Sequence, residues 1–327
     1  MSLMTIQRLE KIQVLIYLAA ILCGGMAATL VPHHAGLLEA ALWPTLGLLL
    51  YVTFTQVQLS HMREALLDGR FLTAAIVGNF VFIPLALWLS LPLLPAEPAV
   101  RLGVVMVLLV PCTDWFITFT QLGGGDTRRA IAFAPISLLL QILLLPVYLV
   151  LFFGGEAVVT LASGDMIRAF FGLIVLPFAL AFATQKWVEA VPGRVPLLER
   201  AGWLPIPLLA LVILIIAASQ FNLVAEFTHL FPPLLLVFAV FLFGAAVLAK
   251  VMTFLGALNQ RQGRVLAFSF GTRNSFVVLP LALALPPSYE LVAIVIVFQS
   301  LVELVGMAAY LWLVPRWLFR NGKVGSE

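Results

Sequence analysis

The sequence predicts an all-α integral membrane protein with ten transmembrane helices, and composition, hydropathy and the distribution of charge each indicate it. The chain has 327 residues, of which 63% are hydrophobic and only 10% are charged. In soluble globular domains roughly 45–50% of the residues are hydrophobic and about 25% are charged. This composition therefore excludes a water-soluble protein. Because a helix needs about 20 apolar residues to cross a bilayer, the chain is long enough to form membrane helices from end to end.

Apolar windows of helix length follow one another along the chain, separated by charged or Pro/Gly-rich breaks. Their size and uniform apolarity favour helices over the alternating pattern of an outer-membrane barrel. The first window follows Arg8 and Lys11 and is longer than the apolar core of a cleaved signal peptide, so we expect a transmembrane helix there. The windows cover residues 11–31, 37–59, 70–94, 99–122, 128–153, 167–187, 202–222, 230–256, 264–285 and 289–314.

Lysine and arginine gather on one side of the predicted bundle. Fifteen of the 18 lie in the two termini and in alternate loops, whereas the opposite side has Arg101 and Arg168 and one span contains Arg273. Positive charge marks the cytoplasmic side. We therefore expect a multi-pass protein of the cell inner (plasma) membrane with both termini in the cytoplasm. No sustained basic run occurs, so the lipid bilayer is the expected partner and nucleic acid is not.

Five helices in each half predict two inverted five-helix repeats. After an odd number of crossings, the second half must enter the membrane from the opposite side. Helices that start near residues 70, 99 and 128 have counterparts that start near 230, 264 and 289. We expect the first repeat, helices 1–5, in residues 1–160 and the second repeat, helices 6–10, in residues 161–327.

Predicted helices 4 and 9 are each interrupted by polar residues near mid-membrane. Helix 4 meets Pro111, which removes a backbone donor, and helix 9 contains a polar stretch that cannot face lipid. Interrupted helices at corresponding places in two inverted halves are a sequence signal for a transporter's binding site. The candidate substrate-binding residues in the two breaks are Cys112, Thr113, Asn274 and Ser275.

Three ionisable residues, Asp114, Arg273 and Glu303, lie inside predicted helices. Charges within the membrane are costly and usually functional. Asp114 and Arg273 are each about ten residues from the cytoplasmic end of their helix, or about 15 Å, so we expect them to meet and to neutralise each other. Glu303 is expected to carry a proton or cation, with a protonated acid bonded to a neighbouring helix as the alternative.

The sequence indicates neither an enzyme nor a metal or cofactor site. The string Gly123-Gly124-Gly125-Asp126 matches the G-x-G-D of intramembrane aspartyl proteases, but it has no partner aspartate at the same depth, so we interpret it as a turn. Two cysteines in different apolar stretches make neither a disulfide framework nor a zinc motif. Lone amides on apolar helices are expected to cross-link helices: Gln56, Asn79 and Gln141.

Three strings resemble the arsenite permeases of the bile acid:sodium symporter superfamily: Pro111-Cys112-Thr113, Gly125-Asp126 and Leu301-Val302-Glu303. The resemblance covers the whole ten-helix plan. It implies an inverted five-plus-five fold with a panel domain and a core domain, in which helices 4 and 9 are broken and cross. It also implies export of arsenite or antimonite through the cysteine of helix 4, here Cys112.

Helix 9 departs from both branches of that superfamily. Where the resemblance to arsenite permeases would place the glutamate of an Asn-Asn-Phe-Glu string, this chain has Phe276. Where the sodium-coupled branch has a glutamate and a glutamine that bind sodium, this chain has Ser269 and Arg273. A fixed cation at that position disfavours sodium, because like charges at close range in a low dielectric repel strongly.

The favoured function is a secondary active transporter that exports arsenite or antimonite by proton antiport. A thiolate is a soft ligand suited to trivalent arsenic, so Cys112 would contact the metalloid oxyanion or its neutral hydroxide, while Asp114, Arg273 and Glu303 handle charge. The alternative is a sodium- or proton-coupled transporter of a small organic anion whose carboxylate is held by Arg273 and helix N-termini. An ion channel is disfavoured because no ring of like charges is evident.

Overall fold

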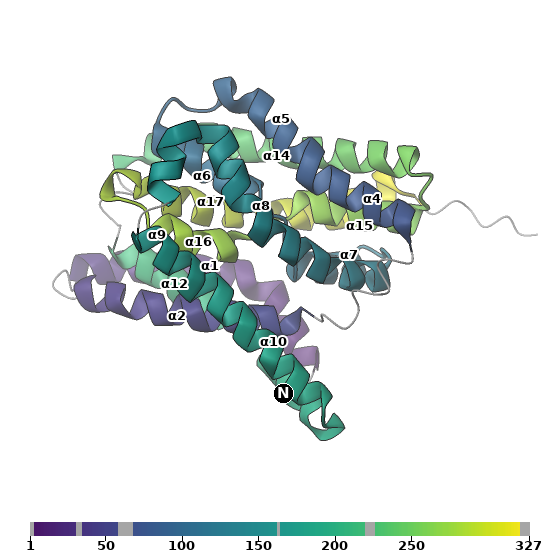
Figure 1. Cartoon of the computed structure of the whole chain (residues 1–327), viewed down its shortest axis with the longest axis horizontal. Coiled ribbons are helices and arrows are strands. Elements are labelled where there is room, and N and C mark those ends of the chain that lie inside the picture. Colours follow the sequence, from purple (N-terminus) through teal and green to yellow (C-terminus); the bar gives the residue numbers. More distant parts are fainter. Residues whose placement is uncertain (1–2, 31–34, 58–67, 162–163, 220–225, 321–327) are drawn as a thin grey trace, which may run out of the picture.

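The computed structural model describes residues 3–30, 35–57, 68–161, 164–219 and 226–320, and within these ranges the structure is helical and contains no β-strand (Figure 1). The predicted all-α class is therefore confirmed. Five spans in the described residues are long and apolar enough to cross a membrane: Gly69–Leu93, Thr127–Gly154, Ile167–Glu189, Thr228–Leu255 and Pro287–Leu318.

Each of the ten apolar windows contains helix. The helices are α1 (Leu3–Leu30), α2 (Ala35–Gln56), α4 (Gly69–Val77), α5 (Ile83–Ser90), α6 (Pro98–Leu108), α7 (Trp115–Leu122), α8 (Thr127–Leu161), α9 (Gly164–Ala169), α10 (Leu176–Glu189), α11 (Val195–Ala201), α12 (Pro205–Ser219), α14 (Phe231–Leu255), α15 (Gln260–Gly271), α16 (Ser275–Leu283) and α17 (Leu291–Leu313). The π-helical turns η3 (Gly78–Phe82) and η5 (Phe170–Val175) connect α4 to α5 and α9 to α10 without interrupting the span.

The windows of predicted helices 4 and 9 each contain two shorter helices instead of one. The first helix of the fourth window, α6, ends at Leu108, and α7 begins at Trp115. In the ninth window α15 ends at Gly271 and α16 begins at Ser275. Both breaks fall where proline, glycine and polar residues interrupt the apolar pattern, because these residues neither continue the helix nor gain from contact with lipid.

Glycine explains two changes of chain direction. Gly124 has φ +67° in the turn between α7 and α8, a conformation that side chains with a Cβ rarely adopt. The G-x-G-D string is thus a turn, as predicted. Gly154 has φ +64° within α8, and the membrane-length part of that helix ends there.

The helices pack in two groups that meet at α16. In one group α1 packs on α12, α12 on α2 and α2 on α10; in the other α14 packs on α15 and α17, and α17 packs on α6. Figure 1 shows α1, α2, α10 and α12 together in the lower part of the view, with α4, α5, α14, α15 and α17 above them. Helix α16 contacts α2 from the first group and α6 and α17 from the second.

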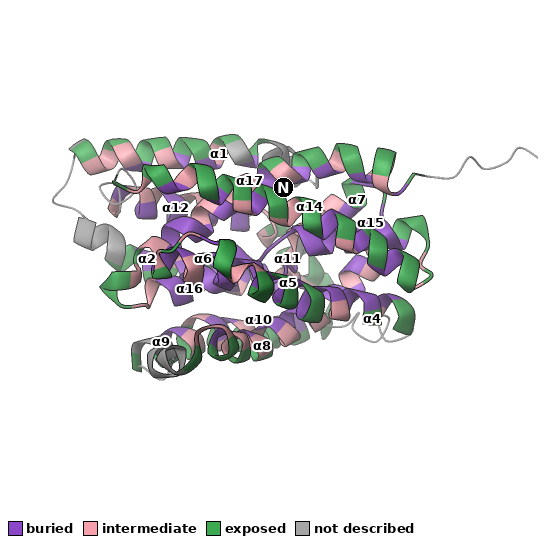
Figure 2. Cartoon of the chain, turned by 90° about the horizontal axis from the view of Figure 1, so that it is seen from above, coloured by how far each residue is buried: buried purple, intermediate pink, exposed green. Residues whose placement is uncertain are grey.

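The two broken helices form the centre of the bundle. Every residue from Gln262 to Ala282 is buried, as is every residue from Gly103 to Thr113. By contrast, large apolar side chains are exposed, among them Leu22, Phe243 and Phe254. In Figure 2 exposed residues, in green, recur along helices at the outside of the bundle such as α1. An exposed apolar surface of this kind suits contact with lipid.

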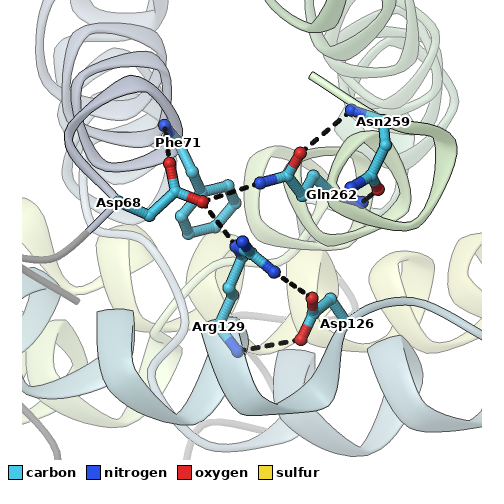
Figure 3. Close-up of polar contacts among 6 residues, drawn as sticks. All are labelled: Asp68, Phe71, Asp126, Arg129, Asn259 and Gln262. Atoms are coloured by element: carbon cyan, nitrogen blue, oxygen red, sulfur yellow. Dashed lines mark hydrogen bonds and ion pairs between the residues drawn. The ribbon is translucent and has the colours of Figure 1, made fainter. Parts of the chain in front are cut away.

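A polar cluster links the N-termini of α4, α8 and α15 (Figure 3). The carboxylate of Asp68 accepts hydrogen bonds from the backbone N–H of Phe71 at 3.2 Å, from Nε of Arg129 at 2.7 Å and from Nε2 of Gln262 at 2.8 Å. Arg129 also forms an ion pair with Asp126. Because one side chain from each of three helices takes part, the cluster fixes the spacing of these helix ends.

We predict that Asp68→Asn destabilises the protein by about 1 kcal/mol near neutral pH, the value expected for a partly exposed ion pair after solvent screening. Burial alone would raise the pKa of Asp68, but the hydrogen bonds from Arg129, Phe71 and Gln262 lower it below its ordinary value. A lowered folded pKa contributes stability above the unfolded value of about 4, and this contribution is lost as the pH falls through the folded pKa.

The measurement is the thermal midpoint of the detergent-solubilised parent and of Asp68→Asn as a function of pH. The difference between these two midpoints should become smaller below about pH 4. Glu189→Gln is the matched control, because its ion pair with Lys186 is more exposed, with side-chain exposures of 43% and 59%. A loss from Asp68→Asn no larger than that from Glu189→Gln would contradict the prediction.

Candidate functional site

The two helix breaks pair with each other through their backbones. The N–H of Cys112 donates to the carbonyl oxygen of Thr272 at 3.2 Å, and the N–H of Asn274 donates to that of Val110 at 2.7 Å. Pro111 and Arg273 are thereby joined in an antiparallel bridge. Groups that the breaks release from helical hydrogen bonds thus find partners within the protein, as they must where water is absent.

Four helix ends meet at the crossing, the place where the breaks of the two interrupted helices pair. The N-termini of α7 and α16 carry partial positive charge, and the C-termini of α6 and α15 carry partial negative charge. Asn274 caps α16, since its Oδ1 accepts from the N–H of Val277 at 3.3 Å, and its Nδ2 donates to Oγ1 of Thr113 at 3.3 Å. Two of the predicted substrate-binding residues, Thr113 and Asn274, are therefore in direct contact across the crossing.

The Cys112 thiol lies beside a carboxylate. Its Sγ donates to Oδ1 of Asp114 at 3.1 Å. Cys112 is 3% exposed, whereas Asp114 is only partly buried. Trp115, the next residue, packs against Tyr17 of α1 and Phe276 of α16, with ring centroids 6.3 and 5.4 Å apart. The thiol and carboxylate thus lie at the N-terminus of α7, next to an aromatic wall.

The guanidinium of Arg273 is bonded to uncharged oxygens. Its Nη1 donates to the carbonyl oxygen of Leu108 at 3.1 Å, and its Nη2 donates to those of Ser269 and Phe270 at 3.1 and 2.7 Å. A fourth acceptor is Oδ1 of Asn79 in η3, at 3.1 Å from Nη2. Arg273 is 3% exposed, so these contacts take the place of water.

The expected ion pair between Asp114 and Arg273 is not formed. Among the described residues, ion pairs within 4 Å join Arg129 to Asp68 and Asp126, and Lys186 to Glu189. The physical reason lies in the helix ends: the carboxylate lies at a helix N-terminus and the guanidinium at two helix C-termini, where each complements the local dipole.

Glu303 supports the break from α17. Its Oε2 accepts from the backbone N–H of Arg273 at 2.8 Å and from Nε2 of Gln299 at 2.7 Å. The Oε1 of Gln299 accepts from Oγ of Ser275 at 3.2 Å, and Ser300 Oγ lies 2.8 Å from the same hydroxyl. The fourth predicted substrate-binding residue, Ser275, thus belongs to a hydrogen-bonded chain that ends at Glu303.

A sequence model described as the sodium bile acid symporter family matches residues 43–250. The chain belongs to this family. No curated protein matches the chain. Members of the family are transporters, and together with the long apolar helices this shows that the chain is a multi-pass membrane transporter. The match includes Cys112 and Asp114 but ends before the second break, so the positions of Arg273 and Glu303 relative to the crossing come from the structure.

The structure brings together the residues predicted from the two breaks and adds others to them. Asn79, predicted to cross-link helices, does so: its Nδ2 donates to Oγ of Ser269 at 3.0 Å, in addition to the bond from Arg273. Gln299 and Ser300 were missed. Their spacing of four and three residues before Glu303 puts them on the same side of a helix, and this signal could have revealed them.

The two other amides that were predicted to cross-link helices, Gln56 and Gln141, differ in their contacts. Gln56 donates to the carbonyl oxygen of Leu198 at 3.5 Å, in keeping with a cross-link, whereas the side chains of Ser137 and Gln141 are buried without a hydrogen-bond partner among the described residues. In those same residues no group of three or more His, Cys, Asp or Glu side chains is arranged to hold a metal ion.

We predict that Arg273 is energetically coupled to Asn79 more strongly than to Asp114. Contacting residues commonly show coupling energies of about 0.5–3 kcal/mol, and Asn79 contacts the guanidinium whereas Asp114 does not. Two double-mutant cycles, one with Asn79→Leu and Arg273→Gln and one with Asp114→Asn and Arg273→Gln, would measure this by thermal unfolding. Equal or larger coupling in the Asp114 cycle would contradict the prediction.

Proposed function

We propose that this member of the sodium bile acid symporter family is a secondary active transporter that exports arsenite or antimonite by proton antiport. The observation that carries the proposal is the pairing of the Cys112 thiol with the Asp114 carboxylate, 3.1 Å apart, where the two broken helices cross. Trivalent arsenic binds soft thiolate sulfur. A thiol beside a proton acceptor at the centre of a transporter suits a thiophilic substrate.

The proposed binding step is a reversible exchange of ligands on arsenic. The sulfur of Cys112 bonds to the arsenic of neutral arsenous acid, and one arsenic–oxygen bond breaks. The thiol proton passes through Asp114 to the departing hydroxide, which leaves as water, so neither arsenic nor sulfur changes oxidation state. Because one thiol replaces one hydroxide, the complex is weaker than one with three thiols, and substrate can be released on the other side.

The proposed coupling assigns protons to the carboxyls and no role to sodium. Asp114 borders the thiol, and Glu303 is bonded to the backbone of the second break; both carboxyls are thus placed to gain or lose a proton as the crossing rearranges. Thr113, Asn274 and Ser275 would supply hydrogen bonds to substrate hydroxyls. Arg273 would keep a positive charge at the crossing throughout the cycle.

We propose the following organisation in the membrane. Residues 1–160 and 161–327 form two inverted repeats, and both termini lie on the cytoplasmic side of the cell inner membrane. The excess of Lys and Arg in the termini and alternate loops supports this orientation. The pairing of a break in each half supports the repeat, because inverted repeats place their broken helices at corresponding positions.

A small organic anion is the second candidate substrate, and two observations favour it. One is the family itself, whose description names bile acid. The other is a cavity of about 540 Å³ between α1, α12 and α17, with an apolar lining that includes Ile213, Ile294 and Phe298. This cavity could hold the apolar body of such an anion. Nη1 and Nη2 of Arg273 already donate to four oxygens, so a carboxylate would have to bind at Nε, which has no hydrogen-bond partner among the described residues.

We predict that Cys112→Ser abolishes arsenite export and leaves folding intact, because a hydroxyl fills the space but is a poor ligand for a thiophilic centre. The measurement is arsenite flux in vesicles, with the thermal midpoint of the purified variant as the test of folding. Cys23→Ser is the matched control, since Cys23 is an exposed free thiol on α1. Export by Cys112→Ser at the parental rate would exclude the metalloid proposal and favour the organic anion.

We predict that transport responds to an imposed pH gradient and not to a sodium gradient. Carboxyls at the crossing can carry protons, whereas a fixed cation near the same helix ends opposes the entry of sodium. The measurement is substrate flux in vesicles under each gradient separately, with equal ionic strength and a clamped membrane potential. Flux that requires sodium and ignores pH would exclude proton antiport.

A further inference from the structure

An apolar groove runs between α5 and α14, which Figure 1 shows in the upper part of the view. Its volume is about 550 Å³, and among the described residues that line it Ser90 alone has a polar side chain. Leu236 and Val240 in its lining are 65% and 61% exposed. Both walls belong to spans that are long and apolar enough to cross a membrane, Gly69–Leu93 and Thr228–Leu255. The groove therefore opens toward the hydrocarbon of the bilayer.

The groove is about as long as one leaflet of a bilayer is thick. Along α14 its lining extends from Leu236 to Leu248, which are about 18 Å apart at the helical rise. Half of the hydrocarbon core of a bilayer measures about 15 Å. An acyl chain of a membrane lipid thus matches the groove in both length and polarity.

Two opposite charges lie at the end of the groove where the apolar span of α5 ends. The lining there includes Leu94, and Arg101 donates to the carbonyl oxygens of Leu94 at 3.5 Å and Pro95 at 2.8 Å. Glu97, the N-cap of α6, precedes Arg101 by one helical turn. Both charged residues are half-buried, and neither forms an ion pair within 4 Å in the described part of the chain. The two charges therefore do not neutralise each other directly.

A zwitterionic headgroup with a primary ammonium complements these two charges. Phosphate accepts strong hydrogen bonds from a guanidinium, here that of Arg101. The carboxylate of Glu97 lacks donors, since its buried Oε2 has no hydrogen-bond partner among the described residues, and an ammonium group has three N–H donors. The trimethylated nitrogen of choline has no N–H, and a glycerol headgroup leaves a net negative charge that Glu97 would repel.

We propose that the groove is a binding site for phosphatidylethanolamine, with one acyl chain between α5 and α14, the phosphate at Arg101 and the ammonium at Glu97. The lining also includes Leu108, whose carbonyl oxygen accepts from Arg273 at 3.1 Å, and Phe241, whose ring lies 5.2 Å from the Arg273 guanidinium carbon. The bound chain thus packs against two residues that contact Arg273. This inference is independent of the transported substrate.

The test is lipid binding by the purified, delipidated protein, measured by native mass spectrometry together with the thermal midpoint. Phosphatidylethanolamine, phosphatidylcholine and phosphatidylglycerol with identical acyl chains are compared. We expect saturable binding of phosphatidylethanolamine about tenfold tighter than that of either other lipid, the factor that corresponds to one charge-assisted hydrogen bond. The midpoint should rise over the same concentration range. Equal affinity for the three lipids would overturn the proposal.

Gly244→Leu tests the place of the acyl chain. Gly244 lines the groove, and a Cβ added there would have no atom within 4 Å, so a leucine fills the groove without a clash. Leucine also favours a helix more than glycine does. We expect the variant to be at least as stable as the parent without lipid and to bind phosphatidylethanolamine at least about tenfold more weakly, the effect of losing the apolar contacts of the chain. Parental affinity in Gly244→Leu would exclude the groove as the site.

Gly172→Leu is the matched control, because Gly172 is also exposed in an apolar span, has no atom within 4 Å of an added Cβ and lies outside the groove. It should bind phosphatidylethanolamine as the parent does. A loss as large as that of Gly244→Leu would show that the effect is not specific to the groove and would refute the proposal.

Two further variants test the headgroup and decide the matter if Gly244→Leu does not fold. Arg101→Ala should weaken the binding of all three lipids, because phosphate is common to them. Glu97→Gln should weaken phosphatidylethanolamine alone and abolish its preference over phosphatidylcholine. Arg168→Ala removes an exposed arginine outside the groove and should change neither affinity. Parental affinities in Arg101→Ala, or a preference that persists in Glu97→Gln, would refute the assignment.

Discussion

The structure depends on the backbone pairing of two interrupted helices. Breaking a helix inside a membrane leaves N–H and C=O groups without partners, and each such group costs several kcal/mol if it faces lipid. Here the two breaks satisfy one another through the Cys112–Thr272 and Asn274–Val110 hydrogen bonds. The pairing permits polar residues at the centre of the bundle, and the surrounding helices bury the pair completely.

At the crossing, the negative and the positive side chain lie at helix ends of opposite polarity. Helix N-termini favour anions and helix C-termini favour cations. Asp114 lies at the N-terminus of α7, and the side chain of Arg273 reaches back to the C-termini of α6 and α15. Each charge is thus compensated where it stands, which leaves the thiol of Cys112 beside a carboxylate that has no cationic partner within 4 Å among the described residues.

This separation gives the crossing two distinct sides. On one side, the thiol, the Asp114 carboxylate and two helix N-termini form a region that could bind substrate and exchange a proton. On the other side, the guanidinium, Asn79 and the carbonyl oxygens form a region that holds the helix ends in place. Glu303 connects the two, because it accepts from the backbone of Arg273 and continues through Gln299 to Ser275. A change in its protonation would therefore act on the break itself.

The sequence by itself determined the all-helical membrane class, the positions of the helices and the places where two of them break. These features follow from local properties: apolar runs as long as a bilayer is thick, and proline or polar residues that cannot continue them. Tertiary structure alone decided which groups meet. The sequence predicts a similar depth in the membrane for Asp114 and Arg273, yet the two side chains do not pair. Depth gives the position of a residue along the helix axis but not the direction in which its side chain points around that axis. In the sequence Asn79 is only a lone amide on an apolar helix, and its contact with Arg273 could not be predicted. The two residues are 194 positions apart, so their contact depends on how whole helices pack and leaves no local pattern in the sequence.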